Sequence, residues 1–323
     1  MPTSHTVSQT ILVTGANGLV GSALCQALAQ AGHQVFAGVR TIEPERARAI
    51  KQIQIPDLAH ELAQWPLNGV DVVVHTAARV HRMGAAAQDH AAYKAVNTDG
   101  TLRLAQACIR AGVKRLVFLS TAKVHGEQSP RGQPFHRDDP LAPGDPYAQS
   151  KAQAETQLFE LAKRSDLAVT VVRPPLVYGR GARGNLQSLC AWIDRGWPLP
   201  IGALDRNRRS LVSLGNLVDL LGRCVEHPSA VNQAFLVSDD HDVSTLALAR
   251  AMAQARARKL RAWPLPEPLL RGLARLVGRQ AMIERLTQNL QLDISATQTI
   301  LDWQAPETLD FAMQQAFAAR PDA

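Results

Sequence analysis

The 323-residue sequence predicts an α/β protein, a doubly wound parallel sheet with a smaller, loop-rich C-terminal lobe. Three observations lead to this fold class. Strand-like and helix-like stretches alternate through the first half, as they do when helices cover both faces of a parallel sheet. Several of the strand-like stretches are near-continuous Val, Ile and Leu runs, which is typical of strands buried on both sides. From Arg173-Pro174-Pro175 onward the alternation fails, and proline, glycine and tryptophan become dense.

The elements follow in chain order. The strands expected in the first half cover residues 10–14, 34–39, 51–55, 70–75, 114–120 and 168–173. The clearest helices cover residues 18–31, 88–111 and 146–164, and two of them end in Ala-Gly, a common helix stop. Residues 231–238 are a further candidate strand, one that returns to the sheet.

These elements suggest a division of the chain into two parts. Residues 1–173, with a returning segment at about 208–240, form the sheet domain. Residues 174–207 and 241–323 form the lobe, which we expect over the carboxyl ends of the strands, where ligands of such sheets bind.

The first strand leads into a glycine-punctuated turn, Gly15-Ala16-Asn17-Gly18-Leu19-Val20-Gly21, and a helix pattern starts at once. Glycines at Gly15, Gly18 and Gly21 let the backbone turn sharply, approach a pyrophosphate and pack helix against strand. The helix then presents free N–H groups and its positive dipole end to the phosphates. A plain turn before a core helix has a similar pattern, but the position between strand and helix near the N-terminus favours a dinucleotide site.

The composition describes an ordinary globular protein with a basic bias. The formal net charge is +7 and the pI about 9.6, which suits anionic ligands, nucleic acid or a membrane surface. No zinc-finger, RNP-like or basic-aromatic pattern supports nucleic acid. The stretch Pro266 to Arg279 is amphipathic and basic, and it suits either a membrane surface or a lobe helix with solvated arginines.

The cysteines and the apolar stretches bear on the compartment. Cys25, Cys108, Cys190 and Cys224 form no Cys-x-x-Cys pair, so we expect buried thiols and neither disulfides nor a metal site. No stretch looks like a signal peptide or an integral membrane segment, and we expect a cytoplasmic protein.

Two sequence features suggest acid–base chemistry. Tyr147 and Lys151 lie four residues apart at the start of a predicted helix, and this spacing places both on one helix face. A neighbouring ammonium is expected to lower the tyrosine pKa from about 10 toward the operating range. Upstream, a buried strand ends in Ser120-Thr121, where a hydroxyl can either bond a substrate oxygen or cap the strand.

Together, the glycine turn, Ser120-Thr121 and Tyr147-x-x-x-Lys151 resemble the extended short-chain dehydrogenase/reductase family. The likeness runs from about residue 9 to Leu301-Asp302-Trp303 and implies a Rossmann-type domain. It also implies that Tyr147 exchanges a proton with the sugar, that Lys151 binds the nicotinamide ribose, and that Thr121 shares the substrate oxygen. At His125 this sequence departs from the family's usual tyrosine.

The resemblance also implies further site residues. A dinucleotide would contact the turn residues Gly15, Asn17, Gly18, Leu19, Val20 and Gly21, the adenine-side Asp57, the strand-end Ala77 and Ala78, and Asn97, Tyr147 and Lys151. The substrate, a nucleotide-diphosphate sugar that is expected to be UDP-linked, would contact Arg79, Thr121, Asn185 and Arg209. The family further suggests a homodimer through the helices at 88–111 and 146–164.

Two departures from the family pattern narrow the choice among the family's reactions. Dehydratases carry an acidic residue directly after the catalytic hydroxyl, and here the pair is Ala122-Lys123, which disfavours that activity. After the second strand, Val39-Arg40 replaces the carboxylate usual for NAD, which favours NADP(H), with NAD(H) as the alternative.

We therefore expect a 4-keto-reductase of a UDP-4-keto-6-deoxyhexose or its amine in surface polysaccharide synthesis. The alternative is a UDP-hexose or UDP-N-acetylhexosamine 4-epimerase that holds NAD tightly. A non-catalytic dinucleotide sensor and a reductase of non-sugar carbonyls remain open as well.

Overall fold

The computed structural model describes residues 8–43, 50–60, 64–80, 88–182, 185–276 and 280–318. A seven-stranded sheet, parallel throughout, runs through its centre in the order β3-β2-β1-β4-β5-β6-β9. Its strands are β1 (Thr10–Thr14), β2 (Gln34–Val39), β3 (Lys51–Gln54), β4 (Val72–His75), β5 (Arg115–Leu119), β6 (Ala168–Arg173) and β9 (Gln233–Leu236). The predicted fold class is confirmed, because the apolar strand runs form the buried centre of this sheet.

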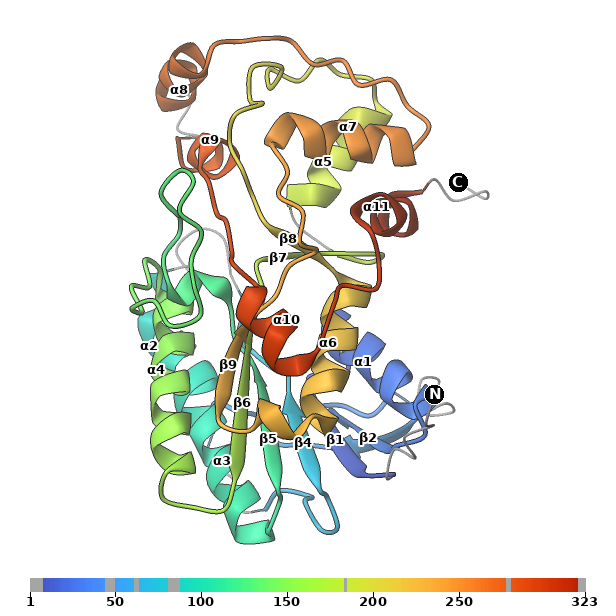
Figure 1. The fold of residues 1–323 in the computed structure, drawn as a ribbon, viewed down its shortest axis with the longest axis vertical. Coiled ribbons are helices and arrows are strands. Elements are labelled where there is room, and N and C mark those ends of the chain that lie inside the picture. The colour runs from blue at the N-terminus through green and yellow to red at the C-terminus, as the bar shows by residue number, and fades with distance from the viewer. Residues whose placement is uncertain are drawn as a thin grey trace.

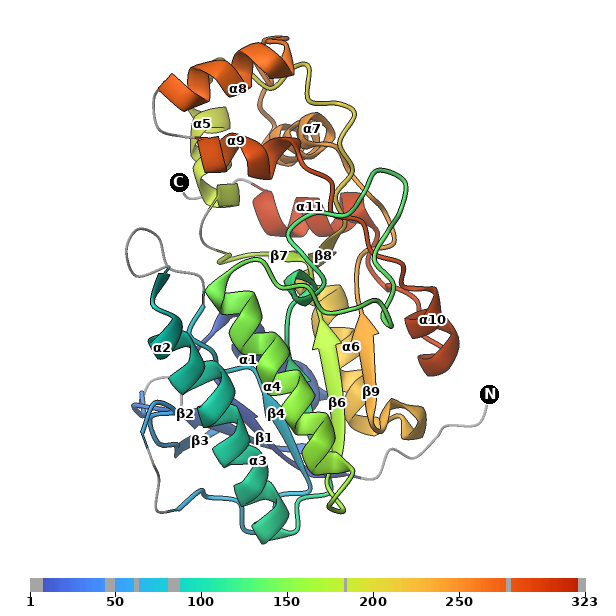
Figure 2. The same ribbon diagram turned by 90° about the vertical axis from the view of Figure 1, so that its left-hand side faces the viewer.

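Helices cover both faces of the sheet (Figure 1, Figure 2). On one face, α1 (Leu19–Gln30) and α6 (Leu214–Glu226) share an apolar core that includes Leu24, Leu28 and Leu217. On the other, α3 (Gly100–Ala111) and α4 (Pro146–Ala162) bury Leu104 and Leu158 against the strands. The carboxyl ends of the strands therefore lie at one edge of a rigid three-layer body.

The stretch 88–111, predicted as one helix, changes its winding within its length. It begins as α2 (His90–Tyr93), widens into a π-helical segment at Lys94–Asp99 and continues as α3. Gly100 comes directly after the π-helical segment and packs closely against Leu58, because a Cβ at Gly100 would lie 2.6 Å from the Leu58 carbonyl oxygen. Wide turns of this kind are frequent at functional sites, and this one carries Asn97.

The second lobe gathers above the carboxyl edge of the sheet (Figure 1). A two-stranded parallel ladder, β7 (Leu176–Tyr178) and β8 (Leu211–Ser213), lies at its base. Its helices are α5 (Asn185–Asp194), α7 (Thr245–Ala255), α8 (Glu267–Leu276), α9 (Gln280–Thr287) and α11 (Leu309–Phe317), while α10 (Ser295–Leu301) packs beside β9. Within the described ranges, no helix has the length and apolar character needed to span a bilayer.

Candidate active site

The glycine turn between β1 and α1 has the geometry of a dinucleotide cradle. Gly15 has φ +74°, and a Cβ there would lie 2.7 Å from the Ala77 backbone. A Cβ on Gly21 would collide with the Gly15 carbonyl, and the Gly18 N–H donates to that same carbonyl at 2.8 Å. The turn thus tolerates only small residues, and it places the N-terminus of α1, with Leu19 and Val20, beside the strand-end segment Ala77-Ala78.

The residues expected around the adenosine half are exposed. Arg40 follows β2 with its side chain in solvent, and Asp57 uses its carboxylate to accept the Ala59 N–H at 3.0 Å. Asn17 donates from Nδ2 to Glu43 Oε1 at 3.2 Å, which brings a carboxylate next to the glycine turn. Sequence reasoning missed Glu43, because it lies in a loop beyond the end of the second strand.

Asn97 ties three segments of the site together. Its side-chain amide donates to the Arg79 carbonyl at 3.1 Å and to Ser150 Oγ at 3.0 Å, and its Oδ1 accepts the Arg79 N–H at 2.8 Å. Ser150 in turn donates to the Tyr147 carbonyl at 2.7 Å. The segment after β4 and the first turn of α4 are therefore held in register, and the Arg79 guanidinium lies over the Tyr93 ring at 5.4 Å.

Tyr147 and Lys151 share one face of α4, as predicted. The helix begins at Pro146, and Asp145 caps it by accepting the Ala148 N–H at 2.7 Å. Lys151 is only 1% exposed; its ammonium donates to the Leu119 carbonyl at 2.7 Å and lies 4.2 Å from the Phe118 ring centroid. The ammonium is thus delivered to the carboxyl end of β5.

The pKa of each of these two groups is displaced. Burial lowers the pKa of Lys151 to about 7, against the opposing effect of Glu155. Burial also raises the pKa of Tyr147, as do the nearby Asp145 and Tyr93. The expected lowering by Lys151 is therefore not the direction found, because burial disfavours the phenolate and the ammonium points to the Leu119 carbonyl.

The two hydroxyls after β5 have separate surroundings. Ser120 is buried and donates to the Glu155 carboxylate. Thr121 has an extended backbone, and its Oγ1 accepts the Lys123 N–H at 3.3 Å, capping the short helical turn Ala122–Val124. Since Thr121 keeps its own hydroxyl proton for donation, it is the hydroxyl suited to a substrate oxygen.

Beneath these hydroxyls lies a buried charged cluster that sequence reasoning did not find. Arg173, at the end of β6, donates to Glu155 Oε2 at 2.7 Å from Nη2 and to His125 Nε2 at 3.0 Å from Nη1. Both partners of the ion pair are at most 6% exposed. Burial and Arg173 lower the pKa of His125 to about 4, so this histidine is a neutral acceptor in the interior.

Two of the residues predicted for the substrate side, Asn185 and Arg209, lie in or near the second lobe. Arg209 bridges by its backbone to Val243 and Leu290, and its Nη1 donates to the Gln288 carbonyl at 3.3 Å. Burial lowers the pKa of its guanidinium. Asn185 is the first residue of α5.

In the ranges that the structure describes, no group of three or more His, Cys, Asp or Glu side chains could hold a metal ion. All four cysteines are free and buried.

Fold and site together define an enzyme of the extended short-chain dehydrogenase/reductase class. The chain belongs to the NAD dependent epimerase/dehydratase family, whose model matches residues 11–237. The matched range begins at the second residue of β1 and ends just after β9, so it includes part or all of each of the seven strands.

Relatives and solved structures agree with this assignment. A UDP-glucose 4-epimerase of Vibrio cholerae is 41% identical over 315 residues, which cover 96% of this chain and 95% of that protein. The N-acetyl-alpha-D-glucosaminyl-diphospho-ditrans,octacis-undecaprenol 4-epimerase of Escherichia coli O157:H7 is 28% identical over 81% of this chain and 77% of its own. The fold matches the UDP-glucose 4-epimerase of Thermotoga maritima with TM-score 0.76 at 20% identity, over 95% of this chain and 97% of that one.

Proposed function

We propose that the chain transfers hydride to and from C4 of a UDP-linked hexose, and that the net reaction is 4-epimerisation. The observation that carries the proposal is the grouping of Tyr147, Lys151 and Thr121 at the edge where the glycine turn also opens. The 41% identical relative, named a UDP-glucose 4-epimerase, supports the choice of sugar position and nucleotide.

The residues of this chain would perform the following roles. The glycine turn and α1 would hold the pyrophosphate, and Lys151 would hold the nicotinamide ribose; when bound, the nicotinamide accepts and returns the hydride. Tyr147 exchanges a proton with the oxygen on C4, and Thr121 donates a hydrogen bond to that oxygen. Lys151, by its positive charge, would favour the phenolate that forms when Tyr147 gives up its proton.

We also propose that the two parts of the chain divide this work. Residues 1–173, with the returning segment at about 208–240, hold the dinucleotide. Residues 174–207 and 241–323 hold the substrate, with Asn185 on its diphosphate. Arg209, at the start of the returning segment and bridged to Val243 and Leu290 of the lobe, reaches the same diphosphate. The pairing of β9 with β6 supports the returning segment, and a guanidinium is a natural phosphate ligand.

Incubating the purified protein with UDP-glucose alone tests the proposal. Formation of UDP-galactose without added dinucleotide is expected, because an epimerase regenerates its cofactor in each cycle. The Tyr147→Phe variant is the matched control, and no conversion of UDP-glucose or of UDP-N-acetylglucosamine by the wild type would refute 4-epimerisation.

A second candidate is reduction of a UDP-4-keto-6-deoxyhexose with NADPH, and Arg40 is the observation that favours it. An exposed guanidinium after β2 offers a cation to a 2′-phosphate. Glu43, hydrogen-bonded to Asn17, argues the other way, because a carboxylate there suits the ribose hydroxyls of NAD.

Cofactor preference separates these candidates. If Arg40 recognises a 2′-phosphate, Arg40→Asp shifts the preference toward NADH by about tenfold, whereas Glu43→Gln shifts it toward NADPH. Dissociation constants for both dinucleotides, measured by fluorescence quenching, give the answer. An unchanged ratio in Arg40→Asp removes the argument for the reductase.

A further inference from the structure

The end of the second lobe carries an apolar helix face on the outside of the molecule. In α8, Leu270 and Ala274 are buried, whereas Leu269, Leu273 and Leu276 are 59%, 54% and 84% exposed. The three exposed leucines recur at helical spacing and so share one face. Figure 2 shows α8 lying across the end of the lobe, beyond α9 and α5 and on the opposite side from the sheet.

Two exposed tryptophans lie on the segments that precede α8 and pair with its approach. Trp263, just before α8, is 59% exposed, and Trp197 is 50% exposed. Their segments run side by side, because the Trp263 N–H donates to the Leu199 carbonyl at 2.8 Å and the Leu199 N–H donates to the Arg261 carbonyl at 2.8 Å. Exposed tryptophan side chains are typical of the membrane–water interface.

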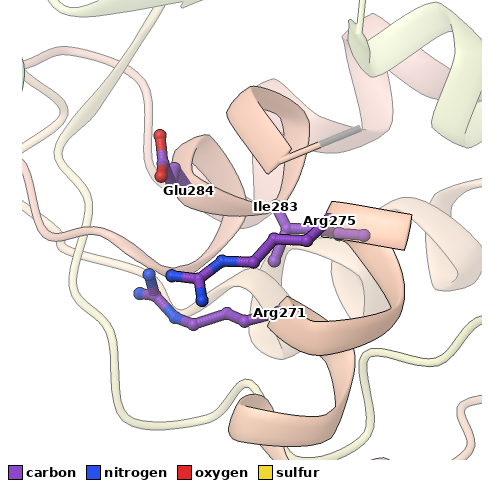
Figure 3. A pocket seen from close by; sticks show the side chains of 5 residues that line it. Arg271, Arg275, Ile283 and Glu284 are labelled. Carbon is purple, nitrogen blue, oxygen red and sulfur yellow. The ribbon is translucent and has the colours of Figure 1, made fainter. Parts of the chain in front are cut away.

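The stretch that contains α8 has a strong excess of positive charge. Residues 256–276 contain six arginine and lysine side chains and one carboxylate, a net charge of +5 out of +7 for the whole chain. Arg258, Lys259, Arg261 and Arg275 are exposed. Figure 3 shows Arg271 and Arg275 leaving α8 in the same direction, along the pocket that α8 and α9 form, whereas Leu269, Leu273 and Leu276 lie on a different face of the helix.

We propose that this α8 surface, made of Trp197, Trp263, Leu269, Leu273 and Leu276 with the flanking cations, docks on an anionic phospholipid bilayer. Leucine and tryptophan would enter the headgroup region while arginine and lysine bind lipid phosphates, as in interfacial amphipathic helices. The choice of an anionic bilayer over a protein partner rests on charge complementarity, because exposed cations and exposed leucine and tryptophan side chains occur in the same short stretch of chain. The proposal is independent of the reaction, since none of the candidate catalytic residues belongs to the surface.

Co-sedimentation of the full chain with vesicles tests the apolar contribution. Binding is expected to vesicles of phosphatidylcholine mixed with phosphatidylglycerol, but not to phosphatidylcholine alone. Leu269→Gln combined with Leu273→Gln removes apolar surface without changing charge, and should weaken binding by about tenfold or more. The matched control, Phe311→Gln with Val231→Gln, removes exposed apolar side chains elsewhere and should bind as the wild type.

A second pair of variants tests whether the charges act locally. Arg258→Gln with Arg275→Gln should weaken binding and its salt dependence more than Arg110→Gln with Lys163→Gln, which removes the same charge from the ends of α3 and α4. Thermal unfolding verifies that each variant folds.

Three results would overturn the proposal: no binding to the anionic vesicles at low salt, equal losses in the two charge variants, or undiminished binding of the leucine variant. Self-association that the leucine variant abolishes would also overturn it, by assigning the face to a second copy of the chain.

Discussion

The carboxyl edge of the sheet and the second lobe are built in different ways. At the sheet edge, candidate residues follow directly from parallel strands, as Ala77 follows β4 and Thr121 follows β5. In the second lobe, Arg209 is placed by isolated bridges to Val243 and Leu290, from segments distant in the chain. The difference suggests that continuous ladders, with α4 packed on them, hold the proposed reacting groups, whereas sparse bridges hold the groups that select the substrate.

The largest effect is expected at the sheet edge. Tyr147→Phe removes the proton donor and should lower kcat by about 10²- to 10⁴-fold, with little change in dinucleotide affinity. Tyr93→Phe is the control, since its ring contacts Tyr147 edge-on at 6.1 Å but its hydroxyl has no part in the reaction. Steady-state kinetics of the two variants decide the point, and near-normal turnover of Tyr147→Phe would remove the proposed mechanism.

The two regions can also be compared by the free energy of unfolding that one ion pair of each region contributes. Arg173→Met leaves Glu155 charged and buried, which should cost about 3–5 kcal/mol of unfolding free energy. Arg256→Met breaks the Arg256–Asp194 pair of the second lobe, whose side chains are 24% and 32% exposed, and should cost only about 1 kcal/mol. Denaturant unfolding of both variants measures the contrast, and equal losses would contradict it.

Acid should destabilise the sheet region through its buried histidines. Burial lowers the pKa of His75 to about 3 and that of His125 to about 4, below the ordinary value of 6.5. The unfolded chain therefore binds more protons below pH 6.5, and each histidine removes about 1.4 kcal/mol of stability per pH unit until its folded-state pKa is reached.

Matched histidine variants test this sign. Between pH 6.5 and about 4, His125→Gln should reduce the slope of unfolding free energy against pH by about 1.4 kcal/mol per pH unit, the contribution of one histidine. His241→Gln, exposed in the loop that leads into α7, should leave the slope unchanged. Unfolding free energies across this pH range give both slopes, and a slope in His125→Gln as steep as in the wild type would refute the assignment.

The smallest effect is expected in the second lobe. Arg209→Lys keeps the charge but loses the forked donor geometry, and should raise the KM for the UDP-sugar about tenfold with little change in kcat. The effect on a substrate without the diphosphate should be negligible. A fall in kcat instead would mean that Arg209 acts on the reacting sugar. The division between reacting groups at the sheet edge and substrate-selecting groups in the lobe would then not hold.

The homodimer through the helices at 88–111 and 146–164 remains a prediction. Sedimentation equilibrium of the full chain measures it.

Local patterns in the sequence were sufficient for the sheet, the glycine turn and the placement of Tyr147 and Lys151 on one helix face. These depend on strand and helix periods and on glycine conformations, which act over a few residues. The resemblance also pointed to Asn97 as a site residue, and the structure adds its partners, Arg79 and Ser150.

Only the tertiary structure decided the partners, the burial and the pKa values of the charged groups. The pairing of Glu155 with Arg173, the carboxylate of Glu43 beside Asn17 and the raised pKa of Tyr147 all depend on which distant segments meet and how much water they exclude. A charge in the sequence has no defined surroundings until packing sets its burial and its neighbours, and these determine its pKa and its partners. The sequence alone therefore proposed the reacting groups, while the fold determined the burial and the neighbours that shift their pKa values.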